Sequence, residues 1–201
     1  MRFIGITGGI GAGKSMILSY IREHYLCEVW LADEVARLVQ RKGTACHAAL
    51  AELLGEEILD ADGEIDRNAM ARRIFKDARI LEQVNAIVHP AVRRYLADRL
   101  AEAERNPEVE LFFVEAALLI EAGYEEWVDE LWYVRADEET RRARLQNDRG
   151  YDPERIAGIM GSQLTDEQFL QHCDFVIDNS GEPADGYRQI DQKLEGFSWR
   201  D

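Results

Sequence analysis

The stretch Ile6-Thr7-Gly8-Gly9-Ile10-Gly11-Ala12-Gly13-Lys14-Ser15 decides the fold of this chain. From Gly8 onward it matches the pattern G-x-x-x-x-G-K-[ST]. Residues 3–7 form an apolar run without polar alternation, which predicts a buried parallel strand. Residues 15–21 have the apolar spacing of a helix. A strand, a glycine-rich loop and a helix in this order begin an α/β unit.

The loop has the chemistry needed to bind ATP with Mg²⁺. Glycines let backbone N–H groups approach phosphate oxygens, and the start of the next helix presents free N–H groups and a positive dipole end. Lys14 is expected to reach the β and γ phosphates, and the Ser15 hydroxyl to coordinate Mg²⁺. The predicted nucleotide-binding residues here are Gly8, Gly9, Gly11, Ala12, Gly13, Lys14, Ser15 and Met16. A glycine-rich turn with a solvated lysine is the alternative, but it does not explain the flanking strand and helix.

The remaining chain predicts one domain over residues 1–201 with further strands at 27–31, 111–114, 131–134 and 175–177. Strands that alternate with helices predict the three-layer α/β/α fold of P-loop NTPases, with a mostly parallel sheet. Residues 44–105 contain no strong strand and are interpreted as a helical insertion. A helix break is expected at His89-Pro90, because proline disfavours helix at the residue before it.

Composition limits the classes of partner and the compartment. The net charge is −15 and the sequence pI is about 4.7, so the molecule as a whole repels nucleic acid. Cys27, Cys46 and Cys173 form no CxxC pair, which indicates reduced structural thiols. The sequence contains neither a signal peptide nor an apolar stretch near the ~20 residues that span a bilayer. A cytoplasmic protein that binds neither nucleic acid nor membrane is expected.

Two carboxylates follow predicted strands, where ligands of open α/β sheets bind. Asp33 follows the second strand and has two interpretations: it orients or deprotonates an acceptor hydroxyl, or it caps a helix. Glu115 ends the strand at 111–114; it either helps to hold Mg²⁺ or the acceptor, or is simply a polar strand end.

The segment 137–149 is rich in arginine. Arg141 and Arg142 stand four residues after acids, which favours a solvated face with surface ion pairs. Arg144 and Arg149 are the better candidates to bind the transferring phosphate from a mobile lid. His89 on its own is interpreted as a structural histidine, and Trp30, Phe75 and Tyr95 as core residues.

Several motifs in order make the chain resemble the dephospho-coenzyme A kinase family from Ile4 to about Gly181. They are the loop at 6–15, Ala32-Asp33 with Ala36-Arg37, His89-Pro90, Glu115 followed by Leu118-Leu119-Ile120-Glu121, Gln163, and Ile177-Asp178-Asn179-Ser180-Gly181. Some positions depart from the family pattern: Met16, Leu31, Glu115, Ala117 and the order Asp148-Arg149. Lys14, Ser15 and Asp33 are retained, so activity is expected.

The resemblance implies phosphorylation of the ribose 3′-hydroxyl of dephospho-coenzyme A by ATP, the last step of coenzyme A synthesis. It implies an acceptor-binding insertion at 44–105 and a lid at 137–170. Asp33 would act on the acceptor, and His89 would lie near the acceptor pocket. Glu115, from its position at the strand end, is also predicted to bind the substrate. Asn179 and Ser180 would lie near the adenine of ATP. The predicted catalytic residues are Asp33, Lys14, Arg144 and Arg149.

Two other functions remain open on the sequence. One is a kinase for another small acceptor, such as a nucleoside monophosphate or a sugar acid. The other is a nucleotide-switched regulatory protein, although the chain has no Asn-Lys-x-Asp guanine signature. For each kinase the expected partner is a small-molecule substrate, and the expected assembly is a monomer or small homo-oligomer.

Overall fold

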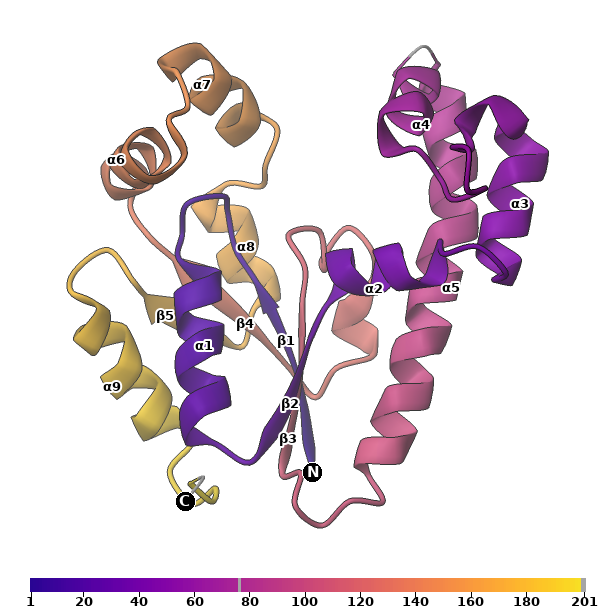
Figure 1. Cartoon of the computed structure of the whole chain (residues 1–201). Helices are drawn as coiled ribbons and strands as arrows, with labels where there is room; N and C mark the ends of the chain where they lie inside the picture. Colours follow the sequence, from indigo (N-terminus) through magenta and orange to yellow (C-terminus); the bar gives the residue numbers. More distant parts are fainter. Residues whose placement is uncertain (76, 200–201) are drawn as a thin grey trace. The chain divides into compact units, whose positions relative to one another are not determined.

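Five strands form one sheet in the computed structural model, which describes residues 1–75 and 77–199. The strand order is β2-β3-β1-β4-β5 (Figure 1). The strands are β1 (Arg2–Thr7), β2 (Cys27–Leu31), β3 (Leu111–Glu115), β4 (Glu130–Arg135) and β5 (Phe175–Asp178). β1 runs parallel to β3 and β4, and β4 runs parallel to β5. The predicted parallel sheet and the positions of its strands are confirmed.

Helices cover both faces of this sheet, which explains why its central strands lack polar alternation. Successive side chains of a strand point to opposite faces. In β4, the Glu130 carboxylate pairs with Lys193 of α9 (Pro183–Lys193) at 2.8 Å. The Tyr133 ring stacks on Phe169 of α8 (Asp166–His172), with centroids 4.5 Å apart. Since these two strand residues are three positions apart, α9 and α8 lie on opposite faces.

The chain divides into two compact units. Unit 1 consists of Met1–Val29 and the chain from Ala103 onward. Beyond α8 and α9, its helices are α1 (Lys14–His24), α6 (Glu138–Arg149) and α7 (Pro153–Gly161), with the 3₁₀ turn η2 (Tyr124–Glu126). Asp137, Asp152 and Thr165 cap α6, α7 and α8 by accepting backbone N–H groups, so these helices begin where the sequence supplies a cap.

Unit 2, Trp30–Glu102, is helical. It contains α2 (Ala32–Val39), α3 (Ala45–Leu54), η1 (Glu56–Ile58), α4 (Arg67–Ile74) and most of α5 (Ala78–Ala103). The Trp30 and Tyr95 rings meet edge to face, but both residues are only partly buried, so the core prediction holds for them only in part. The same prediction is wrong for Phe75, which ends α4 and is 89% exposed.

The expected helix break at His89-Pro90 is also wrong, because α5 runs through Pro90 without interruption. Val84, Val88, Val92 and Leu96 are spaced four residues apart and are all buried. This apolar row continues across the proline, so packing offsets the backbone hydrogen bond that proline cannot donate. Within the two described ranges, no helix is both long and apolar enough to cross a membrane.

The three cysteines are free thiols, as predicted, and Cys27 and Cys46 are buried.

Candidate active site

The glycine-rich loop connects β1 to α1 and prepares the start of that helix for an anion. Gly13 is the N-cap residue and has φ of 93°, in the left-handed region that favours glycine. A Cβ at this position would lie 2.2 Å from Asn179 Nδ2, so no larger residue fits. The first N–H groups of a helix have no acceptor within the helix. Lys14 and Ser15, the first two helical residues, therefore present N–H groups suited to phosphate oxygens.

Lys14 lies over the loop and faces a carboxylate. Its Nζ donates to the Gly8 carbonyl at 2.8 Å and lies 3.6 Å from Glu115 Oε1. Burial lowers the pKa of Lys14 below its ordinary value of 10.5, while the charge of Glu115 opposes this shift and those of Arg141 and Arg149 add to it. β1 and β3 are parallel neighbours with Ile6 opposite Glu115, which brings the two strand ends together. Nothing in the sequence indicates this ion pair, because the two residues are about a hundred positions apart.

The Lys14–Glu115 pair predicts a pH effect. A protonated Lys14 is needed to attract phosphate, and the negative charge of Glu115 raises its pKa. Glu115→Gln removes that charge, so the lysine loses its proton at lower pH. We expect the alkaline limb of the pH profile of kcat/KM for ATP to move to lower pH. Glu126→Gln, which changes an exposed residue of η2, is the control and should leave the alkaline limb in place. An unchanged alkaline limb in Glu115→Gln would contradict the role of Glu115 in keeping Lys14 protonated.

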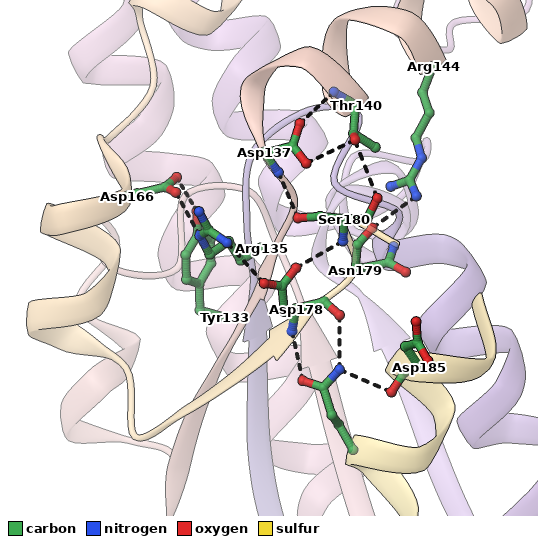
Figure 2. A network of polar contacts seen from close by, with 11 residues as sticks. Tyr133, Arg135, Asp137, Thr140, Arg144, Asp166, Asp178, Asn179, Ser180 and Asp185 are labelled. Carbon is green, nitrogen blue, oxygen red and sulfur yellow. Dashed lines mark hydrogen bonds and ion pairs between the residues drawn. The ribbon is translucent and has the colours of Figure 1, made fainter. Parts of the chain in front are cut away.

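Asn179 and Arg144 meet on the loop (Figure 2). Asn179 is 1% exposed, and its Nδ2 donates to the Ala12 carbonyl at 2.7 Å. Arg144 donates from Nη2 to the Asn179 carbonyl at 2.9 Å and from Nη1 to the Ala12 carbonyl at 3.4 Å. Three segments that are distant in sequence, at 12, 144 and 179, are thus brought together. Ala12 itself is buried beneath these contacts.

Ser180 fastens the end of β5 to the start of α6 (Figure 2). Its hydroxyl accepts from the Asp137 N–H at 3.0 Å, and its carbonyl accepts from Thr140 Oγ1 at 3.3 Å. Its own N–H donates to Asp178 Oδ1 at 2.9 Å, and the hydrogen bonds from Ser180 lower the pKa of Asp178. The segment after β5 is therefore held rigidly beside the first turn of α6.

The interpretation of Arg141 as a solvated residue is wrong. Arg141 is 7% exposed, and its Nε donates to the Ile10 carbonyl at 2.9 Å. Its Nη2 donates to Gln163 Oε1 at 2.8 Å. The interpretation is confirmed for Arg142, which pairs with Glu138 one turn earlier. Spacing along a helix identifies ion-pair partners but does not identify which side of the helix faces a loop distant in sequence.

The other predicted nucleotide-side residues are less constrained. Arg149 is the exposed last residue of α6. Ser15 is exposed in the first turn of α1, and Met16 beside it is partly buried. Gly8, Gly9 and Gly11 form the loop between β1 and α1.

In unit 2, Asp33 is the second residue of α2 and is exposed. The N-cap of this helix is Leu31, so the interpretation of Asp33 as a cap is wrong. Asp33 lines a groove of about 500 Å³. The other polar residues of the groove are Arg37, Gln40, Arg41, Glu64 and Arg67. His89 is exposed in the middle of α5.

The parallel sheet with this loop between its first strand and first helix defines a P-loop NTPase, the class of protein that binds nucleotide phosphates on such a loop. A solved dephospho-CoA kinase from Campylobacter jejuni has the same fold, with a TM-score of 0.71, 20% identity and coverage of 96% of this chain and 95% of the other. A solved Thermus thermophilus protein is more similar: the TM-score is 0.81 at 29% identity, and 97% and 98% of the two chains are covered.

The sequence model of the family described as dephospho-CoA kinase matches residues 2–185. Dephospho-CoA kinase of Geobacter sulfurreducens is 38% identical over 192 residues, which cover 96% of each chain. This chain belongs to the dephospho-CoA kinase family.

Proposed function

We propose that this chain transfers the γ-phosphoryl group of ATP to the ribose 3′-hydroxyl of dephospho-coenzyme A, giving coenzyme A and ADP. Membership of the dephospho-CoA kinase family is the observation that carries this proposal, since this is the reaction of the family. The hydroxyl oxygen forms a bond to the γ phosphorus as the bond between that phosphorus and the β–γ bridging oxygen breaks. The hydroxyl proton leaves to a base, and the electrons of the broken bond stay on ADP.

On the nucleotide side, we assign the triphosphate to Lys14 and the N–H groups at the start of α1. The contact of Lys14 with loop carbonyls supports this assignment, because an arriving phosphate offers the ammonium group a better acceptor. Asn179 and Ser180 are assigned to the adenine side, and Arg144 and Arg149 to the phosphates. Arg144 already lies on the Ala12 carbonyl, which supports its role.

Mg²⁺ is the expected metal. Within the described residues no cluster of three or more His, Cys, Asp or Glu side chains is suited to hold an ion. This fits Mg²⁺, which usually keeps several waters and binds to one or two protein groups and the substrate phosphates. Ser15 and Glu115 supply the hard oxygen atoms that it prefers. When bound, Mg²⁺ would neutralise phosphate charge.

On the acceptor side, we assign the 3′-hydroxyl to Asp33 and the rest of the acceptor to unit 2. The groove supports this assignment because its three arginines, Arg37, Arg41 and Arg67, suit the diphosphate of dephospho-coenzyme A. His89 is proposed to contact the same acceptor. The segments 44–105 and 137–170 are proposed as the acceptor-binding insertion and the lid.

The groove assignment predicts a selective effect on the acceptor. Arg67→Met should raise KM for dephospho-coenzyme A about 10-fold, because a charged hydrogen bond to phosphate is lost. KM for ATP should stay the same. Arg72→Met is the matched control, since Arg72 is exposed on the same helix and is not among the groove residues. Steady-state kinetics with each substrate varied would test this; equal effects of both changes would contradict it.

We also propose that the enzyme is cytoplasmic and acts as a monomer or small homo-oligomer. It has neither nucleic acid nor membrane partners in this proposal. The charge of −15 supports the absence of polyanion partners.

The decisive experiment measures ADP release from Mg·ATP with and without dephospho-coenzyme A and identifies the product by mass. ADP and coenzyme A in equal amounts are expected. ATP binding without stimulation by dephospho-coenzyme A would overturn the acceptor assignment. Stimulation by a nucleoside monophosphate or a sugar acid instead would identify a kinase for another acceptor. Slow hydrolysis that responds to no acceptor would favour the nucleotide switch.

A further inference from the structure

Ile10 of the phosphate loop is held from both sides by two residues of the segment 137–170, neither of which is assigned a contact with a substrate above. The Ile10 N–H donates to Gln163 Oε1 at 3.0 Å. The Ile10 carbonyl accepts from Arg141 Nε at 2.9 Å. Arg141 Nη2 also donates to the same Gln163 oxygen, at 2.8 Å. These three hydrogen bonds close a ring through Ile10, Gln163 and Arg141, which we call the Ile10 clamp.

The clamp places a buried positive charge directly on the loop backbone. A Cβ added to Gly9 would lie 2.3 Å from Arg141 Nη2 and 2.5 Å from its Cζ, so the guanidinium packs directly against the backbone of Gly9. In the described part of the chain, no carboxylate forms an ion pair with Arg141. A buried charge without a counterion is costly unless it is well hydrogen-bonded. Its partners are the two oxygen atoms of the clamp, so the charge strengthens these bonds.

The residues of the clamp come from separate parts of unit 1. Arg141 lies in the first turn of α6, and Gln163 lies in the connection between α7 and α8. The loop peptide is thus fixed by residues more than a hundred positions away, and not by the loop itself. A loop with several glycines has many accessible backbone conformations, and only some of them direct its N–H groups toward one phosphate. Restricting the loop to these conformations costs conformational entropy.

We propose that Arg141 and Gln163 are positioning residues, which hold the Ile10 peptide groups so that the phosphate loop has its nucleotide-binding conformation before ATP arrives. The proposal rests on the nucleotide half of the proposed function. The clamp acts on the loop, so it strengthens the binding of any nucleotide with a β phosphate. It does not act through contact with the transferred group, and it does not change the affinity for the acceptor.

Binding of ADP and ATP to the full chain, measured by calorimetry in the absence of acceptor, tests the proposal. Arg141→Met and Gln163→Leu should each lower the affinity for ADP and for ATP about 10-fold, since the loop is no longer ordered before binding. Within each variant, the loss should be the same for ADP as for ATP. The double variant should lose at most about 20-fold in affinity for each nucleotide, because both changes break the same ring of hydrogen bonds and their effects do not multiply. KM for dephospho-coenzyme A should be unchanged. Circular dichroism verifies that each variant is folded at the temperature used.

Arg142→Met is the matched control, since Arg142 is the next residue on α6 and pairs with Glu138 at 2.7 Å. It should bind both nucleotides as the unchanged chain does. Gln163→Leu keeps the test decisive if Arg141→Met does not fold, because it removes two clamp bonds without removing a charge. Unchanged affinity in Gln163→Leu would overturn the proposal. If the losses of affinity in the two single variants multiplied in the double variant, the proposal would also be overturned. A loss of affinity for ATP alone in Arg141→Met would overturn it too, because Arg141 would then be a ligand of the γ phosphate. Lack of coenzyme A formation by the unchanged chain would refute the acceptor assignment and leave this binding test unaffected.

Discussion

Lys14→Met is expected to lower kcat/KM for ATP by about 10³-fold, because one charged donor to the developing phosphate charge is lost in a water-poor site. The side chain of Lys14 is 14% exposed, and its Nζ lies 2.8 Å from the Gly8 carbonyl. Methionine has a similar shape without the charge, so the loop keeps its packing while the electrostatic contribution disappears. The substitution also removes the ion pair that Lys14 forms with Glu115 at 3.6 Å.

Steady-state kinetics with ATP varied and dephospho-coenzyme A saturating measures this effect. Lys193→Met is the matched control, because Lys193 is also a partly buried lysine of unit 1 and pairs with Glu130 at the other end of β4. It should change kcat/KM by less than about 3-fold, because this pair lies at the start of β4, away from the phosphate loop. A loss of under tenfold in Lys14→Met would contradict the role of the lysine.

The fold was predictable because its signals are local. Each strand is a short run of apolar residues, and a parallel sheet buried on both faces needs no alternation, so the run itself is the signal. The phosphate loop supplied the connection between strand and helix. The one helical error, at Pro90, came from a local rule that packing overrode: the buried row of Val84, Val88, Val92 and Leu96 continues through the proline.

The position of a candidate residue was predictable where one local motif contains it, as for Lys14 and Ser15, which lie at the start of α1. It was not predictable where function depends on which side of a helix faces a distant loop. Arg141, Arg142 and Arg144 stand within four positions, and two face the loop while one faces solvent. The acids that precede Arg141 were a misleading signal. Gln163 was marked by the family resemblance, but nothing in its neighbourhood in sequence indicates contact with Ile10.

The arginine groove of unit 2 illustrates the same limit. Arg37 lies in α2, and Arg41 follows four positions later, just past the end of that helix at Val39. Arg67 is on a different helix, at the start of α4, and joins them only through the fold of the unit. Nothing in the sequence near Arg37 and Arg41 indicates that Arg67 lies beside them. The cationic surface that suits a diphosphate is therefore a property of the folded unit.

Asp33→Asn is expected to lower kcat by about 10²–10³-fold with less than a threefold change in KM for either substrate, because the amide cannot accept the hydroxyl proton in the transition state. The substitution conserves size, and the residue is exposed in the first turn of α2, so the helix should remain intact. A carboxylate there also interacts favourably with the helix dipole, and its loss costs under about 1 kcal/mol of stability. The effect on catalysis should thus greatly exceed the effect on folding.

Glu34→Gln separates these two effects, because Glu34 is the next residue, is also exposed, and is also in the first turn of α2. It removes the same charge from the same helix end and should leave kcat within about twofold. Single-turnover measurement of phosphoryl transfer at saturating ATP and dephospho-coenzyme A isolates the chemical step. A slow chemical step in Asp33→Asn and a normal one in Glu34→Gln is the expected result. Full turnover in Asp33→Asn would show that Asp33 is not a catalytic residue. Equal losses of kcat in both variants would show that only the negative charge at the start of α2 affects the rate.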